Sequence, residues 1–162
     1  VERYGHYSLA AESMYDRPFQ WGSKRTGPDL ARVGGKYSDT WQLEHLRDPR
    51  SMVPGSVMPA YPWLAATDLS FRDIGADLRV QAALGVPYSD EMIAHAVNDV
   101  RTQATTDAAD SDALLARYPN AQIRDYDGDP RRLTEADALI AYLQLLGTQV
   151  DFKLYDNKAN MR

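Results

Sequence analysis

Histidine, methionine, aspartate and glutamate are the main side chains of this sequence that could ligate a metal, because cysteine is absent. The three histidines, His6, His45 and His95, lie too far apart to form a local metal-binding motif. We therefore interpret them as ordinary core or surface residues. The absence of cysteine also excludes disulfides, thiolate zinc sites, cysteine nucleophiles and a Cys-x-x-Cys-His haem attachment within these 162 residues.

The acidic stretch Asp125-x-Asp127-Gly128-Asp129 is similar to the start of a calcium-binding loop. An EF-hand loop that began at Asp125 would need glycine at its sixth position and glutamate at its twelfth. Pro130 and Ala136 stand there instead, so the sequence excludes an EF-hand. It favours a solvated turn, and a different kind of oxygen-ligand site stays open.

The sequence carries none of the short motifs that mark common enzyme sites. Phosphate-binding glycine loops, Gly-x-Ser-x-Gly and His-Glu-x-x-His are absent, and no nucleophile has an evident base partner. We therefore expect no independent catalysis. The 18 basic and 23 acidic residues give a net charge of −5, and the basic residues are scattered. This balance excludes a protein that binds nucleic acid.

Hydrophobic spacing and helix-end signals predict a mainly α protein with long loops. Ser38 and Ser89 are suited to cap the first turns of two helices, and Pro49 stops the first of them. Strand signals are weak, with a short alternation at 121–124 as the best. The predicted helices cover 39–47, part of 69–84, 89–104, 112–118 and 134–147.

The helix predicted at 134–147 is the clearest of these elements. Thr134 and Asp137 form the pattern of a capping box, and Gly147 is a natural end. Its apolar stripe must be buried, and the aromatic-rich first sixty-odd residues offer the largest apolar surface. We expect this helix to pack against that region. The stripe consists of Leu139, Ile140, Leu143 and Leu146.

Three segments and this last helix together resemble a class I cytochrome c after its haem-attachment motif. The segments that carry the resemblance are Gly27-Pro28-Asp29-Leu30, Gly34-Gly35-Lys36-Tyr37, Met58-Pro59-Ala60-Tyr61-Pro62-Trp63 and the helix with Tyr142-Leu143. In that family the proline carbonyl of the first turn accepts the second N–H of the proximal histidine. The methionine loop supplies a thioether to the other face of the iron. The resemblance implies these roles for Pro28 and Met58.

Longer strings make the resemblance closer, namely 1–8, 21–30, 57–64 and 151–155. They are similar to subunit II of the cbb3-type cytochrome c oxidases, a membrane-anchored monohaem subunit, over essentially the whole chain. The resemblance implies an electron-transfer subunit on the periplasmic side of the bacterial inner membrane. It implies two partners, the dihaem cytochrome c subunit that delivers electrons and the catalytic haem–copper subunit that receives them.

The same resemblance implies a set of haem-binding residues. Met58 is the axial ligand, and Met52 in the same loop is its rival. Trp41, Tyr61 and Trp63 would shield the haem from water, while Arg25 and Lys36 would meet the propionates. The turn residues Gly27, Pro28 and Leu30 complete the set.

One departure concerns the cofactor itself. The transmembrane helix and the Cys-x-x-Cys-His sequence that precede this region in the family do not occur in this sequence. We expect haem c in the complete protein and none in this chain, which starts without methionine and which we interpret as a fragment or a processed product. No apolar run reaches the roughly 18 residues that cross a bilayer, so we expect the fragment itself to be soluble.

The length suits one domain. We expect a single cytochrome c-like domain with its core in 1–64 and 133–149, an insertion at 65–132 that docks on partner subunits, and a polar tail at 150–162. Two other functions stay open. One is a structural or assembly module of the oxidase without haem, and the other is a calcium-stabilised surface module.

Overall fold

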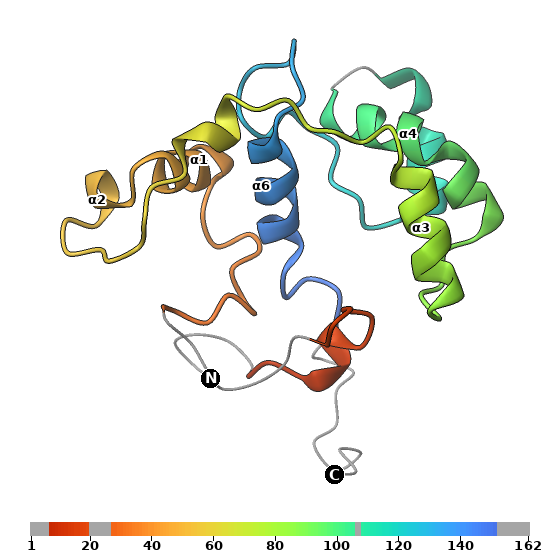
Figure 1. Cartoon of the computed structure of the whole chain (residues 1–162), viewed down its shortest axis with the longest axis horizontal. Coiled ribbons are helices and arrows are strands. Elements are labelled where there is room, and N and C mark those ends of the chain that lie inside the picture. Colours follow the sequence, from red (N-terminus) through yellow and green to blue (C-terminus); the bar gives the residue numbers. More distant parts are fainter. Residues whose placement is uncertain (1–6, 20–26, 106–107, 152–162) are drawn as a thin grey trace. The chain divides into compact units, whose positions relative to one another are not determined.

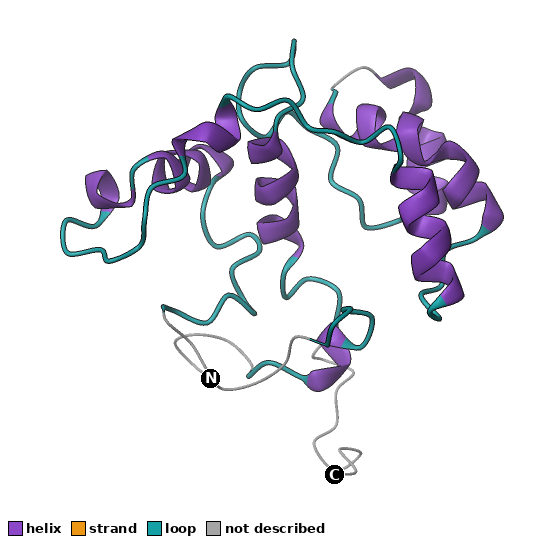
Figure 2. Ribbon diagram, in the orientation of Figure 1, coloured by secondary structure: helices purple, strands orange, loops and turns teal. Residues whose placement is uncertain are grey.

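The computed structural model describes residues 7–19, 27–105 and 108–151 of the 162-residue chain. Every regular element in these ranges is a helix, and long loops connect the helices (Figure 2). The prediction of a mainly α protein is therefore confirmed. The α-helices, labelled in part in Figure 1, are α1 (Asp39–Arg47), α2 (Pro49–Met52), α3 (Ile74–Ala83), α4 (Asp90–Ala104), α5 (Ser111–Arg117) and α6 (Glu135–Leu145). Short 3-10 helices are η1 (Ala10–Ser13), η2 (Pro62–Ala65) and η3 (Ala108–Asp110).

The chain divides into two compact units. One comprises residues 38–141, and the other comprises 1–37 together with 142–162. The helix α6 begins in the first of these units and ends in the second. The division into a cytochrome-like core and an insertion remains a prediction.

In the unit formed by 38–141, local signals start the helices where the sequence places them. The Ser38 hydroxyl accepts a hydrogen bond from the Trp41 N–H over 3.2 Å, and Ser89 caps α4 through the Met92 N–H in the same way. Such caps satisfy donors that the first turn of a helix leaves free. Asp48 ends α1 and then caps α2, where its carboxylate accepts from the Arg50 N–H.

The core of this unit joins α1, α6 and the chain between them. Leu46 of α1, Tyr126, and Ala136 and Ile140 of α6 form the buried cluster. Partly buried side chains pack around it, namely Leu43, Met58, Tyr61, Leu64, Ala65, Leu139 and Ala141. The last helix therefore packs against the region of residues 43–65, as its apolar stripe predicts.

The capping box at the start of α6 also forms. The Thr134 N–H donates to Asp137 Oδ2 over 2.8 Å, and the Asp137 N–H donates to the Thr134 hydroxyl over 3.3 Å. Both residues are buried. The cap thus fixes the end of the helix that supplies Ala136 and Ile140 to the core.

Helices α3, α4 and α5 form a second group within this unit. Helices α3 and α5 both pack on α4. A methyl group at Gly75 would lie 3.1 Å from the carbonyl oxygen of Ile93, so glycine permits the close approach of α3 and α4. Arg117 of α5 donates to the buried carboxylate of Asp99 on α4 through Nε over 3.0 Å and through Nη2. This ion pair fastens the two helices together.

In the other unit, the turn at 33–37 is bonded to the last turn of α6. The Gly34 N–H donates to the Leu146 carbonyl over 3.0 Å, and the Gly35 N–H donates to Gln144 Oε1 over 2.8 Å. Gln144 Nε2 donates to the Tyr37 carbonyl over 2.9 Å. Gly147 follows with a φ of 81°, which is the left-handed conformation of a helix-ending glycine.

Two details differ from the sequence-based expectations. The alternation at 121–124 forms no strand, because it has no neighbouring strand to pair with among the described residues. Helix α2 and the 3-10 helices have only three or four residues each, too few for a periodic signal. Within the described ranges, no helix combines the length and the apolar character that a membrane crossing needs.

Candidate functional site

Met58 lies in the loop between α2 and η2 and is half-buried. Its side chain packs against the core cluster, beside partly buried Tyr61 and Leu64. Two hydrogen bonds hold the backbone of this loop. The Met58 N–H donates to the Ser56 hydroxyl over 3.2 Å, and the Tyr61 N–H donates to the Leu46 carbonyl over 2.8 Å. The thioether therefore lies in apolar surroundings on a loop that is fixed to α1.

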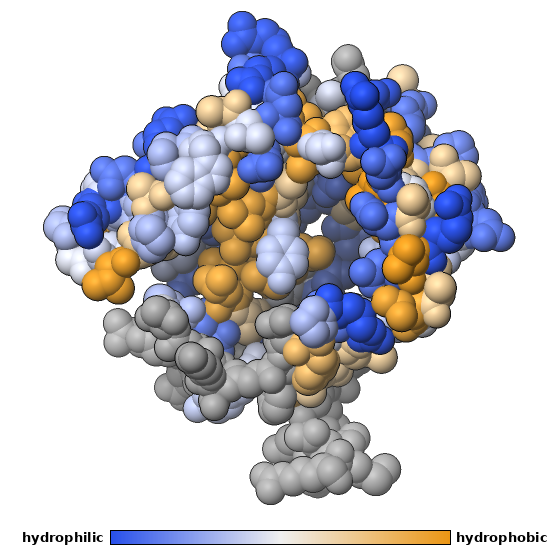
Figure 3. Space-filling view, in the orientation of Figure 1, coloured by the Kyte–Doolittle hydropathy of each residue, from blue (hydrophilic) through white to orange (hydrophobic). Residues whose placement is uncertain are grey.

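Met52, the rival ligand, has different surroundings. It ends α2, its side chain is 39% exposed, and it is not among the residues that pack on the core. Its neighbours Val53 and Val57 are exposed as well. In the space-filling view, an apolar group lies at the outer edge of the loop that follows α2 (Figure 3). The two methionines thus occupy an exposed and a half-buried end of one loop.

The predicted aromatic residues form two ring pairs. Tyr61 and Trp63 meet edge to face with centroids 5.3 Å apart, although the Trp63 side chain is 52% exposed. Trp41 stacks on His45 at 4.6 Å, one turn further along α1. Partial burial lowers the pKa of His45 below its ordinary value and thereby favours the neutral imidazole. Tyr61 is the member of this set that, like Met58, packs on the core cluster.

The other predicted residues belong to the unit of 1–37 and 142–162. Gly27, Pro28 and Leu30 are exposed, and the Leu30 carbonyl accepts from the Val33 N–H over 3.0 Å. The Lys36 ammonium lies 5.4 Å from the centre of the Tyr37 ring. Arg25 lies outside the described residues. The structure thus groups Met58 with Tyr61, and Tyr61 with Trp63, within one unit, and it describes the Gly27 to Lys36 region within the other.

Gln42, the most unusual polar residue of α1, was not identified from the sequence. It is only 3% exposed, and its amide Nε2 has no hydrogen-bond acceptor among the described residues. A buried donor without an acceptor costs free energy, so such groups are rare in folded proteins. Gln42 lies one turn before Leu46 on the same helix. Nothing in the sequence marks it, because glutamine is common in helices.

The aspartate-rich turn at 125–129 folds as a turn, with the Gly128 N–H bonded to Asp125 and a Gly128 φ of 87°. It also meets α6. Asp125, Asp127 and Asp137 each place a carboxylate oxygen within 4.8 Å of the others. Burial, and then the charge of Asp127, raise the pKa of Asp137. Sequence reasoning found the turn and the helix cap separately but not their contact.

These observations test whether the chain fits one face of a haem. A neutral thioether packed on an apolar core is a suitable axial ligand for low-spin haem iron, and Tyr61, which pairs with Trp63, packs on the same core cluster. The unpaired Gln42 donor adds a polar group that an acceptor beside α1 would satisfy. The sequence has no cysteine and no histidine in an attachment motif. The chain therefore fits the methionine side of a haem c site and does not carry the attachment side.

The chain matches a known protein family. The family described as "Cytochrome C oxidase, mono-heme subunit/FixO" matches residues 1–150. No curated protein matches the chain. The family match spans the Gly27-Pro28 turn, the Met58 loop and the last helix. The chain belongs to the FixO family, the electron-transferring mono-haem cytochrome c subunits of cbb3-type oxidases.

Proposed function

We propose that this chain is the methionine-bearing part of an electron relay. Electrons pass from the dihaem cytochrome c subunit through one haem c to the catalytic haem–copper subunit, on the periplasmic side of a bacterial membrane to which the complete protein is anchored. The observation that carries the proposal is the Met58 thioether, which is half-buried against the core on a loop bonded to α1. Family membership supports the same role.

Met58 is the axial ligand in this proposal, and its surroundings explain why it suits electron transfer. The haem, when bound, supplies reversible one-electron oxidation and reduction. The uncharged sulfur of Met58 favours the reduced iron and so raises the reduction potential. The bond from Tyr61 to Leu46 limits the movement of the loop, which keeps reorganisation small when the charge changes. The half-buried position limits the access of water to the sulfur.

We assign the remaining residues by the same reasoning. Trp41, Tyr61 and Trp63 shield the haem, Arg25 and Lys36 meet its propionates, and the Gly27-Pro28 turn with Leu30 orients the proximal histidine. The exposed face of Trp63 is consistent with this assignment, because a large apolar ring beside the ligand loop favours an apolar group against it.

We also propose that these 162 residues do not retain haem by themselves. They include no cysteine to form thioether bonds, and no assigned proximal histidine. The purified 162-residue chain should be colourless. A stoichiometric haem spectrum from this chain would contradict the proposal.

The test of the ligand uses the complete protein with its haem attached. Met58→Ala should leave the haem covalently bound and remove the thioether-to-ferric-iron absorption band near the red end of the visible spectrum. Met52→Ala is the matched control and should keep the band. If Met52→Ala removes the band while Met58→Ala keeps it, the ligand assignment is wrong. If the unsubstituted protein lacks the band, the proposal of methionine ligation itself is wrong.

A further inference from the structure

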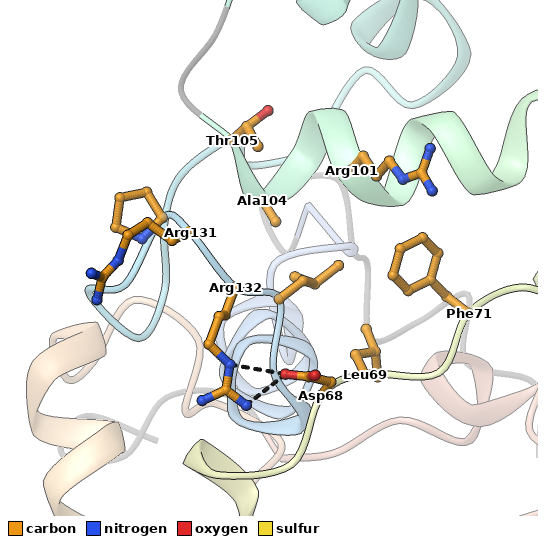
Figure 4. A pocket seen from close by; sticks show the side chains of 10 residues that line it. Asp68, Leu69, Phe71, Arg101, Ala104, Thr105, Arg131 and Arg132 are labelled. Atoms are coloured by element: carbon orange, nitrogen blue, oxygen red, sulfur yellow. Dashed lines mark hydrogen bonds and ion pairs between the residues drawn. The ribbon is translucent and has the colours of Figure 1, made fainter.

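A groove of about 380 Å³ lies within the unit of residues 38–141, and Met58 is not among the residues that line it (Figure 4). Its walls come from the segment 68–71, the C-terminal end of α4 and the segment 130–133. The close-up shows Asp68 and Arg132 at one end and Phe71 with Arg101 at the other. None of its lining residues belongs to the predicted haem site.

Main-chain hydrogen bonds join two walls of this groove. The Leu69 N–H donates to the Leu133 carbonyl over 2.9 Å, and the Glu135 N–H donates to the Thr67 carbonyl over 3.0 Å. Asp68 and Thr134 form an antiparallel bridge between these bonds. Backbone pairing therefore joins two of the three walls of the groove.

The floor and the rim of the groove differ in character. Apolar groups of Leu69, Phe71 and Leu133 line it, together with Ala104. Three arginines, Arg101, Arg131 and Arg132, and one aspartate, Asp68, are the charged residues among the described lining. The rim is thus positive on a chain whose net charge is −5.

Two of the arginines already have carboxylate partners. Arg132 Nε donates to Asp68 over 2.9 Å, and Arg131 Nε donates to Asp129 over 2.8 Å. Arg101 differs, because its guanidinium lies 5.6 Å from the centre of the Phe71 ring and has no carboxylate partner among the described residues. A guanidinium on an aromatic face keeps its in-plane N–H donors available for a bidentate contact.

We propose that this groove binds an acidic segment of another oxidase subunit. A carboxylate of that segment pairs with Arg101, and an adjacent apolar side chain lies on the floor between Phe71 and Leu133. The charge of the rim selects an acidic partner, and the apolar floor favours a peptide over a small hydrated anion. The inference rests on the proposed function, since it requires that the chain works within an assembled oxidase.

The test places a photoreactive benzoylphenylalanine at Ala104 in the assembled oxidase. Ala94, exposed on the same helix and outside the groove, is the control position. Irradiation should attach a peptide from another subunit that contains aspartate or glutamate at position 104 but not at position 94. No cross-link, a peptide without acidic residues, or an attached phospholipid would overturn the proposal.

The second part of the cross-linking experiment reverses the charge at Arg101. Arg101→Glu should lower the cross-linking yield roughly tenfold, as expected for loss of a charge-assisted contact. Arg101→Lys should retain part of it, and Arg79→Glu, the same charge change at an exposed position of α3, should retain all of it. Equal loss in Arg101→Glu and Arg79→Glu would show a general charge effect and overturn the specific contact.

Two further readouts separate the possible failures. Circular dichroism of each variant confirms that the helices persist, so a misfolded variant is recognised and Arg101→Lys then decides the test. The haem spectrum of the same oxidase preparation reports the methionine ligand independently. A normal spectrum without a cross-link refutes the groove and leaves the proposed function intact. A spectrum that lacks methionine ligation refutes the proposed function instead.

Discussion

The main-chain N–H of Tyr61 donates a hydrogen bond to the main-chain carbonyl of Leu46 over 2.8 Å. This bond ties the loop that carries Met58 to the last turn of α1. The Leu46 side chain is itself buried in the core cluster against which Met58 packs. Leu46 therefore stabilises the methionine loop in two ways, through a hydrogen bond to its carbonyl and through the packing of its side chain.

Replacing Leu46 by alanine should reveal this double role. Removal of a buried leucine leaves a cavity and should lower the free energy of unfolding by about 2–4 kcal/mol. Leu84→Ala, at a half-exposed position after α3, is the control and should cost much less. Urea denaturation measures both, and hydrogen exchange should show faster exchange of the Tyr61 amide in Leu46→Ala. Equal losses in the two variants would contradict the assignment of Leu46 to the core.

Thr134→Val should weaken the start of α6. The Thr134 hydroxyl contacts Asp127 over 2.8 Å and Asp137 over 3.0 Å, and valine keeps the shape while it removes the hydroxyl. The loss of the cap and of the group between two carboxylates should cost about 1–2 kcal/mol of unfolding free energy. Thr148→Val, exposed after the same helix, should change it by less than about 0.5 kcal/mol. Thermal unfolding followed by circular dichroism compares the two.

The partial burial of His45 predicts a pH dependence of stability. Its pKa is lower in the folded protein than the ordinary value of 6.5, so the unfolded chain binds a proton more readily. The contribution of His45 to the free energy of unfolding is complete above pH 6.5 and is lost as the pH falls through the pKa of His45 in the folded protein. In His45→Gln, this part of the pH dependence should disappear. Midpoints of urea unfolding between pH 7.5 and 5 measure this pH dependence. Identical dependences of the midpoint on pH in the unsubstituted protein and in His45→Gln would refute the prediction.

Gln42→Leu should have opposite effects in two forms of the protein. In the haem-free chain, leucine removes a buried donor without an acceptor, so the free energy of unfolding should rise by about 1 kcal/mol. In the complete protein with haem, an acceptor beside α1 would satisfy the amide, and the same substitution should then be neutral or destabilising. Denaturant unfolding of both forms provides the comparison. The same stabilisation in both forms would show that the donor stays unpaired when haem is present.

The sequence predicted those elements whose signals are local. The ranges 39–47 and 89–104 agree with α1 and α4, because serine caps and the spacing of apolar side chains act within a few residues. The capping box of Thr134 and Asp137 was predicted for the same reason. Helix α2 was missed because one turn has no period to detect.

The candidate site likewise has local features, which the sequence predicted, and non-local features, which it did not. Met58 could be preferred over Met52 from the motif around it, and the structure adds that Met58 packs on the core. The unpaired amide of Gln42 could not be predicted, because the burial of a helical glutamine depends on chain segments far from it in sequence. The groove beside Arg101 is equally non-local, since its walls lie more than 60 residues apart along the chain, from Asp68 to Leu133.

Gly34 limits which sequences can fold in this way. A methyl group at this position would lie 2.5 Å from the carbonyl oxygens of Gln144 and Leu146, closer than atoms can approach. Both obstacles are backbone atoms, so no change of rotamer relieves the clash, and the turn would have to separate from the end of α6. The bonds from Gly34 to Leu146 and from Gly35 to Gln144 would break first. Natural selection at this position therefore acts on folding, because the turn must pack against the end of the last helix. It would remove alanine whether or not the protein transfers electrons.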